Sequence, residues 1–219
     1  MEEIFTNVYE ICFWGNNKNS NYKGSSGEGS DISYNEEYIA FLKKWINDNS
    51  IKSVVDLGCG DFKCGKLIYD DLDVSYTGYD AYNKLIEYHQ ENIQDTKYEF
   101  IHKDIFQDRE QLKSADVCIL KDVLQHWKTE DIYTFLDYIV QSKKYEYILI
   151  CNCCKQVMDD QTLNTTGHWR QLSCEMLPLK KYNPVKLFTF NTKQICLINV
   201  NAKESKGTPD IQSARSPTR

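Results

Sequence analysis

The stretch SVVDLGCGDF, residues 53–62, places a carboxylate on either side of a Gly-x-Gly turn. The carboxylates belong to Asp56 and Asp61, and the glycines are Gly58 and Gly60. A glycine turn lets a ligand approach the backbone closely, because glycine carries no side chain. Two flanking acids repel a pyrophosphate but attract a ligand with positive charge. The stretch therefore predicts a site for a cationic small molecule.

The residues around the turn argue against two other nucleotide sites. A dinucleotide-binding turn has a third glycine three residues after the second, where this chain has Lys63. A phosphate-binding P-loop ends in Gly-Lys-Ser/Thr, which this turn lacks. S-adenosylmethionine carries both an ammonium and a sulfonium group. We therefore expect S-adenosylmethionine to bind here as the cofactor, with S-adenosylhomocysteine as its product.

Two further acids follow the next two predicted strands. Asp80 ends the stretch YTGYD, where a carboxylate can accept both hydroxyls of a ribose. Asp104 lies in FIHKDIF, where it can accept from an adenine amino group. Each acid alone is more often a helix cap or a solvated side chain. The ordered series favours a binding site, because the carboxyl ends of parallel strands meet at one crevice.

The stretch KDVLQHW, residues 121–127, follows the fourth predicted strand and so borders the same crevice. His126 is a candidate general base, since an unperturbed imidazole has a pKa of about 6.5. The alternative is a histidine that only packs or orients the acceptor. Asp122 is a second catalytic candidate, and its alternative role is to cap the following helix.

The stretch TTGHWR, residues 165–170, follows the fifth predicted strand. His168 is a second candidate base, Trp169 a wall or cation-π partner, and Arg170 an anion clamp for a phosphate or carboxylate. The alternative is an ordered surface loop in which Trp169 is buried.

Two other segments invite a functional interpretation. SSGEGSD, residues 25–31, is a candidate lid over the cofactor, with Trp14 packed near it, although a flexible loop is equally compatible with its composition. CNCC, residues 151–154, has a spacing that matches no standard zinc knuckle, and we expect no metal there. His89 and His102 are expected to be structural.

The segments between these residues alternate between strand and helix patterns, which predicts βαβ units and a largely parallel, doubly wound sheet. Ser33 and Glu36 form a capping-box pattern before the first helix. The expected helices cover residues 33–49, 63–71, 83–93 and 130–142. The expected strands cover residues 52–57, 75–80, 98–104, 116–122 and 145–152, followed by a hairpin over 185–200.

Four stretches together resemble the motifs of class I S-adenosylmethionine-dependent methyltransferases: VVDLGCGDF, YTGYD, HKDIF and CILKDVLQHW. The resemblance covers about residues 33–200 and implies a seven-stranded, mostly parallel sheet with an antiparallel last strand. It also implies contacts with the methyl acceptor from Trp127, Trp169 and Arg170. The cofactor contacts that it implies come from Trp14, Ser30, Asp56, Gly58, Cys59, Gly60, Asp80, Ala81, Asp104, Ile105 and Lys121.

A narrower likeness involves both ends of the core. WGNN…SGEGS and TTGHWRQL are similar to methyltransferases associated with surface-polysaccharide and modified-sugar pathways. This likeness implies a small-molecule acceptor, such as a hydroxyl or amine of a nucleotide-linked sugar. An RNA or protein methyltransferase is the alternative, and a non-catalytic binding module of the same fold is a third. The formal net charge of −6 counts against nucleic acid as a partner.

The 219 residues suit one domain, which we expect over residues 33–202. Residues 1–32 form an N-terminal segment, and residues 203–219 have the composition of a disordered tail. No apolar run approaches the roughly 20 residues that a membrane span needs. The acidic start and nine cysteines, an odd number set mostly in apolar runs, favour a reducing cytoplasm. The oligomeric state is not readable from these features.

Overall fold

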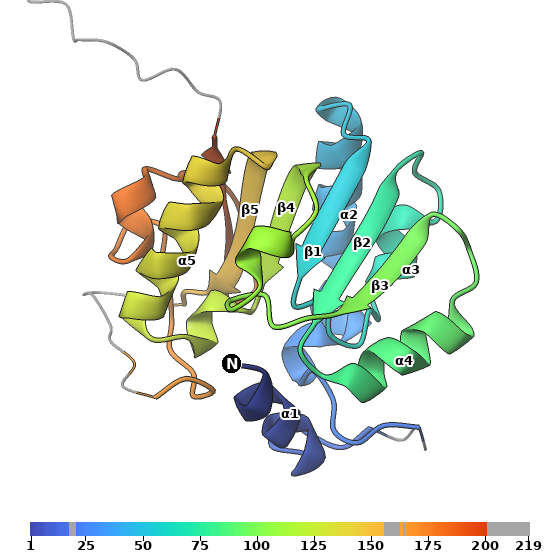
Figure 1. The fold of residues 1–219 in the computed structure, drawn as a ribbon. Coiled ribbons are helices and arrows are strands. Elements are labelled where there is room, and N and C mark those ends of the chain that lie inside the picture. The colour runs from blue at the N-terminus through green and yellow to red at the C-terminus, as the bar shows by residue number, and fades with distance from the viewer. Residues whose placement is uncertain (18–20, 156–162, 164, 201–219) are drawn as a thin grey trace, which may run out of the picture.

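The computed structural model describes residues 1–17, 21–155, 163 and 165–200 of the chain. Its centre is a seven-stranded sheet in the order β3-β2-β1-β4-β5-β7-β6 (Figure 1). Neighbours among β1 to β5 pair in parallel, and β7 runs antiparallel to both β5 and β6. The strands are β1 (Ser53–Leu57), β2 (Ser75–Asp80), β3 (Tyr98–His102), β4 (Ala115–Lys121), β5 (Tyr145–Cys153), β6 (Val185–Phe190) and β7 (Lys193–Asn199). The predicted doubly wound α/β fold with a reversed last strand is confirmed.

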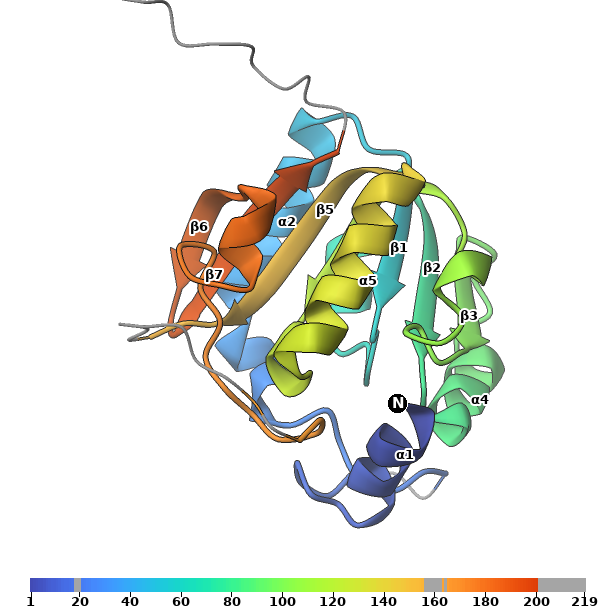
Figure 2. The same cartoon turned by 60° about the vertical axis from the view of Figure 1, so that its left-hand side comes forward.

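Helices cover both faces of this sheet (Figure 2). One face packs against α2 (Glu36–Asp48), α3 (Gly65–Tyr69) and α4 (Asn83–Asn92). The other face packs against α5 (Thr129–Ser142), whose apolar positions recur at helical spacing and are fully buried. Short 3₁₀ turns connect these elements: η1 (Glu28–Ser30), η2 (Ile32–Tyr34), η3 (Arg109–Gln111), η4 (Leu124–His126) and η5 (Leu179–Tyr182).

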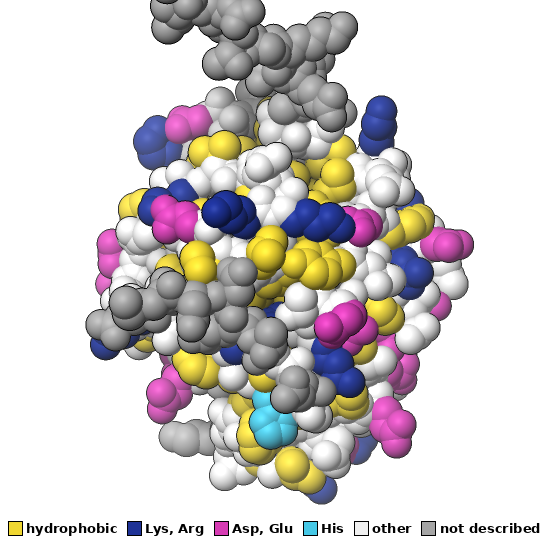
Figure 3. All heavy atoms as spheres, turned by 90° about the vertical axis from the view of Figure 1, so that its left-hand side faces the viewer, with side chains coloured by type: hydrophobic (Ala, Val, Ile, Leu, Met, Phe, Trp, Pro, Cys, Tyr) yellow, Lys and Arg dark blue, Asp and Glu magenta, His cyan; other side chains and the backbone are white. Residues whose placement is uncertain are grey.

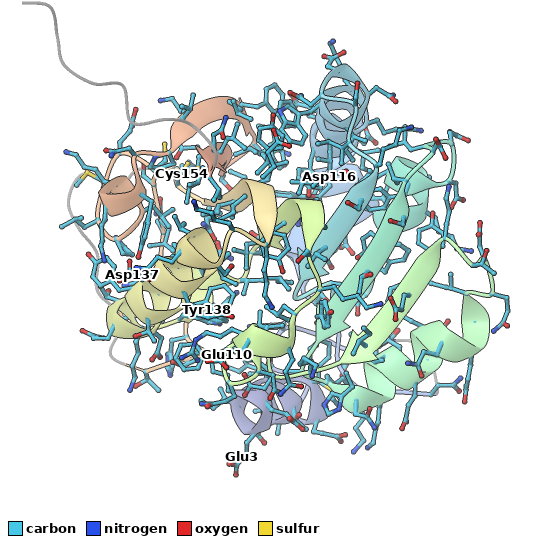
Figure 4. The ribbon with its side chains drawn as sticks, turned by 45° about the horizontal axis from the view of Figure 1, so that its top comes forward. Glu3, Glu110, Asp116, Asp137, Tyr138 and Cys154 are labelled. Atoms are coloured by element: carbon cyan, nitrogen blue, oxygen red, sulfur yellow. The ribbon has the colours of Figure 1, made fainter. Side chains whose placement is uncertain are left out.

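The two ends of the parallel strands have different surroundings. At the amino ends of β1 and β4, the Asp116 carboxylate accepts from the Lys52 and Ser53 amides at 2.7 and 2.9 Å, and the Ser53 hydroxyl accepts from the Asp116 amide. At the carboxyl ends, a further helix, α1 (Glu2–Glu10), lies across the strands (Figure 1). Figure 4 labels Asp116 and Glu3 of α1 at these opposite ends of the molecule. The space between α1 and the carboxyl ends of the strands is therefore where a functional site is expected.

Three local predictions differ from the structure. Helix α1 was not predicted at all. The predicted Ser33/Glu36 capping box is wrong: the N-cap is Asn35, and Ser33 lies inside η2. The Asn35 side chain instead donates back to the carbonyls of Gly29 and Asp31, at 2.9 and 2.7 Å, so it holds the loop that enters α2.

The predicted helix over residues 63–71 shortens to α3. The chain before it turns at Phe62, which has a positive φ of 52° and packs its ring against Gly65. A Cβ on Gly65 would lie 1.9 Å from that ring. The chain therefore turns at Phe62, and the helix begins at Gly65 instead of Lys63. The predicted tail over residues 203–219 lies outside the described residues. None of the described helices is long and apolar enough to cross a membrane.

Candidate functional site

A cavity of about 510 Å³ lies between α1 and the carboxyl ends of β1, β2 and β4. Its size is within the range of ordinary small-molecule sites. Two of the residues predicted to form the site, His168 and Arg170, do not line it. The predicted residues that do line it are Trp14, Ser30, Asp56, Gly58, Cys59, Gly60, Asp80, Ala81, Asp104, Ile105, Lys121, Asp122, His126, Trp127 and Trp169.

The glycine turn after β1 is held against β2. The amides of Gly58 and Cys59 both donate to the Tyr79 carbonyl, at 2.8 and 2.9 Å. Gly58 has a φ of +85°, and a Cβ there would lie 2.6 Å from a Val123 methyl group. A side chain would be strained and would clash, so glycine is required and bare backbone faces the cavity.

Asp80 joins the end of β2 to this turn. It is buried, and its two carboxylate oxygens accept from the Gly60 and Tyr82 amides, each at 3.0 Å. Burial raises the pKa of Asp80, while these amides oppose the rise. Each carboxylate oxygen keeps a second lone pair, so Asp80 can accept from two ligand hydroxyls while still holding the turn.

The two acids that flank the turn do different things. Asp56 is partly buried, accepts from the Tyr76 hydroxyl at 2.8 Å and lines the cavity. Burial raises the pKa of Asp56 to about 6. Asp61 holds the N-terminal segment, because its carboxylate accepts from the Ser26 amide at 2.9 Å and from the Tyr22 hydroxyl at 3.3 Å.

Asp104 is engaged by α1. One oxygen accepts from the Met1 ammonium at 2.6 Å and the Glu2 amide at 2.9 Å, and the other accepts from the amides of Phe106 and Gln107. Burial acts to raise the pKa of Asp104, but the ammonium and the amides hold it below its ordinary value. The predicted contact between Asp104 and an adenine amino group therefore requires these donors to share the carboxylate or to move.

His126 lies in η4, which follows β4 directly. Its Nδ1 is 2.9 Å from the His168 carbonyl oxygen, which can only accept, so Nδ1 carries the proton and Nε2 has the lone pair. Nε2 lies 3.5 Å from the Gln125 side-chain nitrogen. Burial lowers the pKa of His126, which keeps its imidazole neutral near pH 7. This protonation state is the one that a general base needs.

Asp122 belongs to a buried charged cluster that also contains Lys121 and Lys193. The Lys121 ammonium is 2.7 Å from one Asp122 oxygen and 2.9 Å from the Gly29 carbonyl oxygen. Lys193, the first residue of β7, contacts the same Asp122 oxygen and lies 3.1 Å from the same carbonyl. Burial acts to raise the pKa of Asp122, but the two lysines hold it low. Asp122 is thus an ionised partner of two cations, which makes it a poor proton acceptor.

The N-terminal segment closes the cavity. Trp14 packs against His126 with ring centroids 4.8 Å apart, and Tyr9 of α1 stacks on Tyr82 at 4.7 Å. The Tyr9 hydroxyl is 2.7 Å from the Ser26 hydroxyl. Tyr9, Trp14 and Ser26 all line the cavity, so α1 and the chain that follows it form one of its walls.

The stretch 165–170 reaches the cavity through Trp169, whose side chain is half exposed rather than buried. Arg170 is buried, and its guanidinium donates to the Trp127 carbonyl at 3.0 Å and the Thr129 hydroxyl at 2.9 Å. These hydrogen bonds give Arg170 a structural role, because they connect the 165–170 stretch to the chain just after η4. His168 is exposed and contributes its backbone carbonyl to His126.

Some residues at the cavity were not predicted. Lys193, Gln125 and Cys153 line it, together with Phe5 and Tyr9 of α1. Local sequence carries no signal for Lys193, since a lysine beside a hairpin turn is normally solvated. Among the described residues, no three His, Cys, Asp or Glu side chains gather as metal ligands.

Comparison with known proteins places these features in context. A family model described as a methyltransferase domain matches residues 48–195. No curated protein matches the chain.

Solved structures share the fold at low identity. The methyltransferase domain of bacterial CtHen1 has a TM-score of 0.58 at 13% identity, covering 76% of this chain and 99% of that one. Magnesium protoporphyrin IX methyltransferase from Synechocystis, with bound S-adenosylhomocysteine, has a TM-score of 0.53 at 13% identity, covering 75% and 83%. Human N-acetylserotonin methyltransferase, in complex with S-adenosylmethionine, has a TM-score of 0.53 at 15% identity, covering 78% and 57%.

Proposed function

The chain belongs to the methyltransferase domain family, and we propose that it transfers a methyl group from S-adenosylmethionine to a small molecule bound in the cavity beneath α1. The observation that carries the proposal is the coupling of Asp80 to the glycine turn through the Gly60 amide. This contact supports the proposal, because a carboxylate able to accept from ribose hydroxyls and bare backbone then share one wall of a cavity of adequate size.

The residues of this wall fit the methyl donor. Asp80 can accept from the two ribose hydroxyls, and the Gly58–Gly60 turn leaves room for close approach of the ligand. Asp56 suits the ammonium of the amino-acid part, because a positive neighbour would favour its ionised form. Ala81 and Ile105 offer apolar surface in the same cavity. When bound, the donor supplies a methyl group on a positively charged sulfur.

We assign His126 as the residue that takes the proton from the methyl acceptor. His126 lines the cavity, its Nε2 lies 3.5 Å from the Gln125 side-chain nitrogen, which the methyl acceptor would displace, and the His168 carbonyl fixes the ring from the other side. Nε2 accepts the proton of the acceptor hydroxyl or amine as the oxygen or nitrogen attacks the methyl carbon. Trp14 and Trp127 keep water away from the reacting groups, and positioning of the two reactants supplies much of the rate.

The acceptor that we propose is a hydroxyl or amine of a sugar, such as a nucleotide-linked sugar. The lining of the cavity supports a polar acceptor with a flat or ring-shaped body, because it combines indole walls with lysine, glutamine and histidine. The face drawn in Figure 3 has acidic and basic side chains interspersed, and its described residues form no continuous basic groove of the kind that a nucleic acid requires.

The test uses methyl-labelled S-adenosylmethionine with the purified protein and an extract of the source cells. Label in the low-molecular-weight fraction supports the proposal, and label in RNA or protein contradicts the small-molecule acceptor. The extract without the purified protein gives the background, and Asp80→Asn should label more slowly because its ribose contacts are weakened. Binding of S-adenosylhomocysteine, measured by calorimetric titration, tests the donor site separately.

A further inference from the structure

Charged side chains of both signs line the cavity, and some lie beside a group of the opposite sign, as Lys63 does beside Asp61 and Asp122 beside Lys121. Asp56 lies in β1, Asp80 ends β2 and Asp104 follows β3, and these three strands are neighbours on one side of the sheet. The cations Lys121 and Lys193 end β4 and begin β7. The donor-binding features are on the acidic side, so the cationic side is available to the second substrate.

Lys193 is an unusual lysine because its side chain is only 1% exposed. Its ammonium contacts Asp122 and the Gly29 carbonyl, and it lies 5.4 Å from the centre of the Tyr34 ring. Burying an ammonium is costly unless nearby groups compensate it. Lysine carries a strongly hydrated, compact charge, so a buried position of this kind needs a reason beyond packing.

Neutralisation of Asp122 does not account for both lysines. Lys121 and Lys193 contact one and the same oxygen of Asp122, and the cluster holds two positive charges against one negative charge. Burial raises the pKa of Asp56 and the charge of Lys121 acts to lower it, whereas Lys193 is not among the groups that shift the pKa of Asp56. The β7 side of the cluster therefore keeps an excess of positive charge.

The surroundings of Lys193 belong to the acceptor side of the cavity. Cys153 ends β5 and pairs with Lys193 across the antiparallel ladder, and Trp169 lines the same cavity. In the sheet, β4 and β5 lie between β7 and β1. Gly29 lets the Lys193 ammonium approach the backbone, because a Cβ on residue 29 would lie only 3.1 Å from that ammonium.

We propose that Lys193, supported by Lys121, is an anion-binding residue that selects a methyl acceptor carrying a carboxylate or a phosphate. The inference rests on the proposed function and deepens it, because it predicts that the acceptor carries a negative charge. Lys193 would hold the anionic group while the hydroxyl or amine of the same molecule lies toward His126. Arg170, the anion clamp expected from the sequence, is occupied by Trp127 and Thr129, and Lys193 takes that role.

The experiment compares Lys193→Met with Lys186→Met, a hairpin lysine that is half exposed and paired with Glu175. Each protein is saturated with S-adenosylhomocysteine and heated at constant ionic strength with inorganic phosphate or glucuronate as probes. We expect both anions to raise the melting temperature of the wild type and of Lys186→Met, and to have no effect on Lys193→Met. Absence of the effect in the wild type, or its persistence in Lys193→Met, overturns the proposal.

Asp122→Asn is a second variant with the opposite expectation. It removes the negative charge that the two lysines share, so both probes should bind about tenfold more tightly than to the wild type. This variant keeps the proposal testable even where Lys193→Met folds poorly. Unchanged or weaker binding of the probes to Asp122→Asn counts against an anion site.

A third arm separates the acceptor from the donor, whose amino-acid part also carries a carboxylate. Lys193→Met should bind S-adenosylhomocysteine within about threefold of the wild type. A tenfold loss that disappears with decarboxylated S-adenosylmethionine would show that Lys193 holds the donor, and would overturn the assignment to the acceptor. Failure of the wild type to bind S-adenosylhomocysteine at all would instead contradict the proposed function.

Discussion

The His126 ring receives its orientation from a backbone carbonyl rather than from an acid. Because the His168 carbonyl accepts from Nδ1, the lone pair is on Nε2, and no carboxylate raises the basicity of the ring through that contact. Burial lowers its pKa further. A base of this kind is weak but fully deprotonated at neutral pH, so its contribution depends on close positioning of the acceptor.

The pH dependence of methyl transfer follows from this geometry. Only the neutral imidazole accepts a proton, so kcat/KM should be flat above neutrality and should fall as pH drops through the lowered pKa, with its midpoint below about 6.5. Initial rates between about pH 4.5 and 8 give the profile. His126→Asn should lower kcat about 10²-fold or more and remove this acidic limb.

Asp56 titrates in the same interval, since its pKa is about 6, and it needs its own control. Asp56→Asn should weaken donor binding and leave the acidic limb of kcat in place. An acidic limb that survives in His126→Asn but vanishes in Asp56→Asn would move the titrating group from the base to the donor site.

Asp80 has a structural and a binding role at once, through the Gly60 amide and its free lone pairs. Asp80→Asn keeps the size of the side chain but removes its charge and one acceptor. We expect S-adenosylhomocysteine to bind at least about tenfold more weakly, equivalent to about 1.4 kcal/mol, in calorimetric titration. Asp73→Asn, an exposed acid just before β2, is the matched control and should bind normally. Equal affinity in both variants would remove Asp80 from the donor site.

At the scale of elements, the N-terminal segment is attached to the glycine turn by a reciprocal pair of hydrogen bonds. The Ser26 amide donates to the Asp61 carboxylate at 2.9 Å, and the Asp61 amide donates to the Ser26 hydroxyl at 2.8 Å. Tyr9 of α1 joins the same hydroxyl. The segment that covers the cavity is thus connected to the turn that we assign to the donor, and ligand exchange requires this connection to open.

Ser26→Ala tests the segment as a lid. The change removes two of these three hydrogen bonds, each worth about 0.5–1.5 kcal/mol, so S-adenosylhomocysteine should dissociate about tenfold faster in rapid-mixing displacement. Trypsin should also cleave faster after the exposed Lys23. The exposed Ser33 provides the control substitution, Ser33→Ala. An unchanged dissociation rate would mean that the segment is a fixed wall.

The elements that sequence periodicity predicted are those whose apolar residues face one sheet. Helices α4 and α5 and strands β1 to β5 follow from local spacing, because each buries a regular face. Helix α1 has such a pattern in Ile4, Phe5, Val8 and Tyr9, but it packs on the cavity and the 165–170 stretch rather than on the sheet. The pattern could have predicted the helix, although not where it lies.

The functional site, like the fold, could be predicted from the sequence only in part. Residues that follow parallel strands converge by topology alone, which brought Asp56, Asp80 and His126 to one cavity. The roles of Arg170 and Lys193 depended on packing between segments far apart in sequence. Arg170 is close to Trp127 and Thr129, and Lys193 is close to Asp122, only after the chain has folded. The local sequence pattern cannot show whether a basic side chain will be buried against protein groups, as Arg170 is, or will be placed where a ligand can reach it.

For the whole molecule, the cavity is assembled from three distant parts of the chain: the N-terminal segment, the strand ends of the core, and the 169–193 region. Contacts such as Lys121 and Lys193 to Gly29, and Tyr34 to Thr192, connect these parts across the site. A ligand in the cavity touches all three parts, so it can bind the folded chain but not the unfolded one. Binding should therefore stabilise the fold as one unit rather than order a single loop.

Mass action gives the size of this effect. At a concentration 100 times its Kd, S-adenosylhomocysteine should raise the free energy of unfolding by about 2.7 kcal/mol. For a domain of this size that corresponds to a rise of about 5–11 °C in Tm, measured by calorimetry as a single transition. Asp80→Asn at the same ligand concentration should lose about half of this rise or more, because the ligand is then at about 10 times its Kd or less. Two separate transitions, with ligand shifting only the lower one, would show that the N-terminal segment melts independently, and the cavity would then be stabilised locally instead of through the whole molecule.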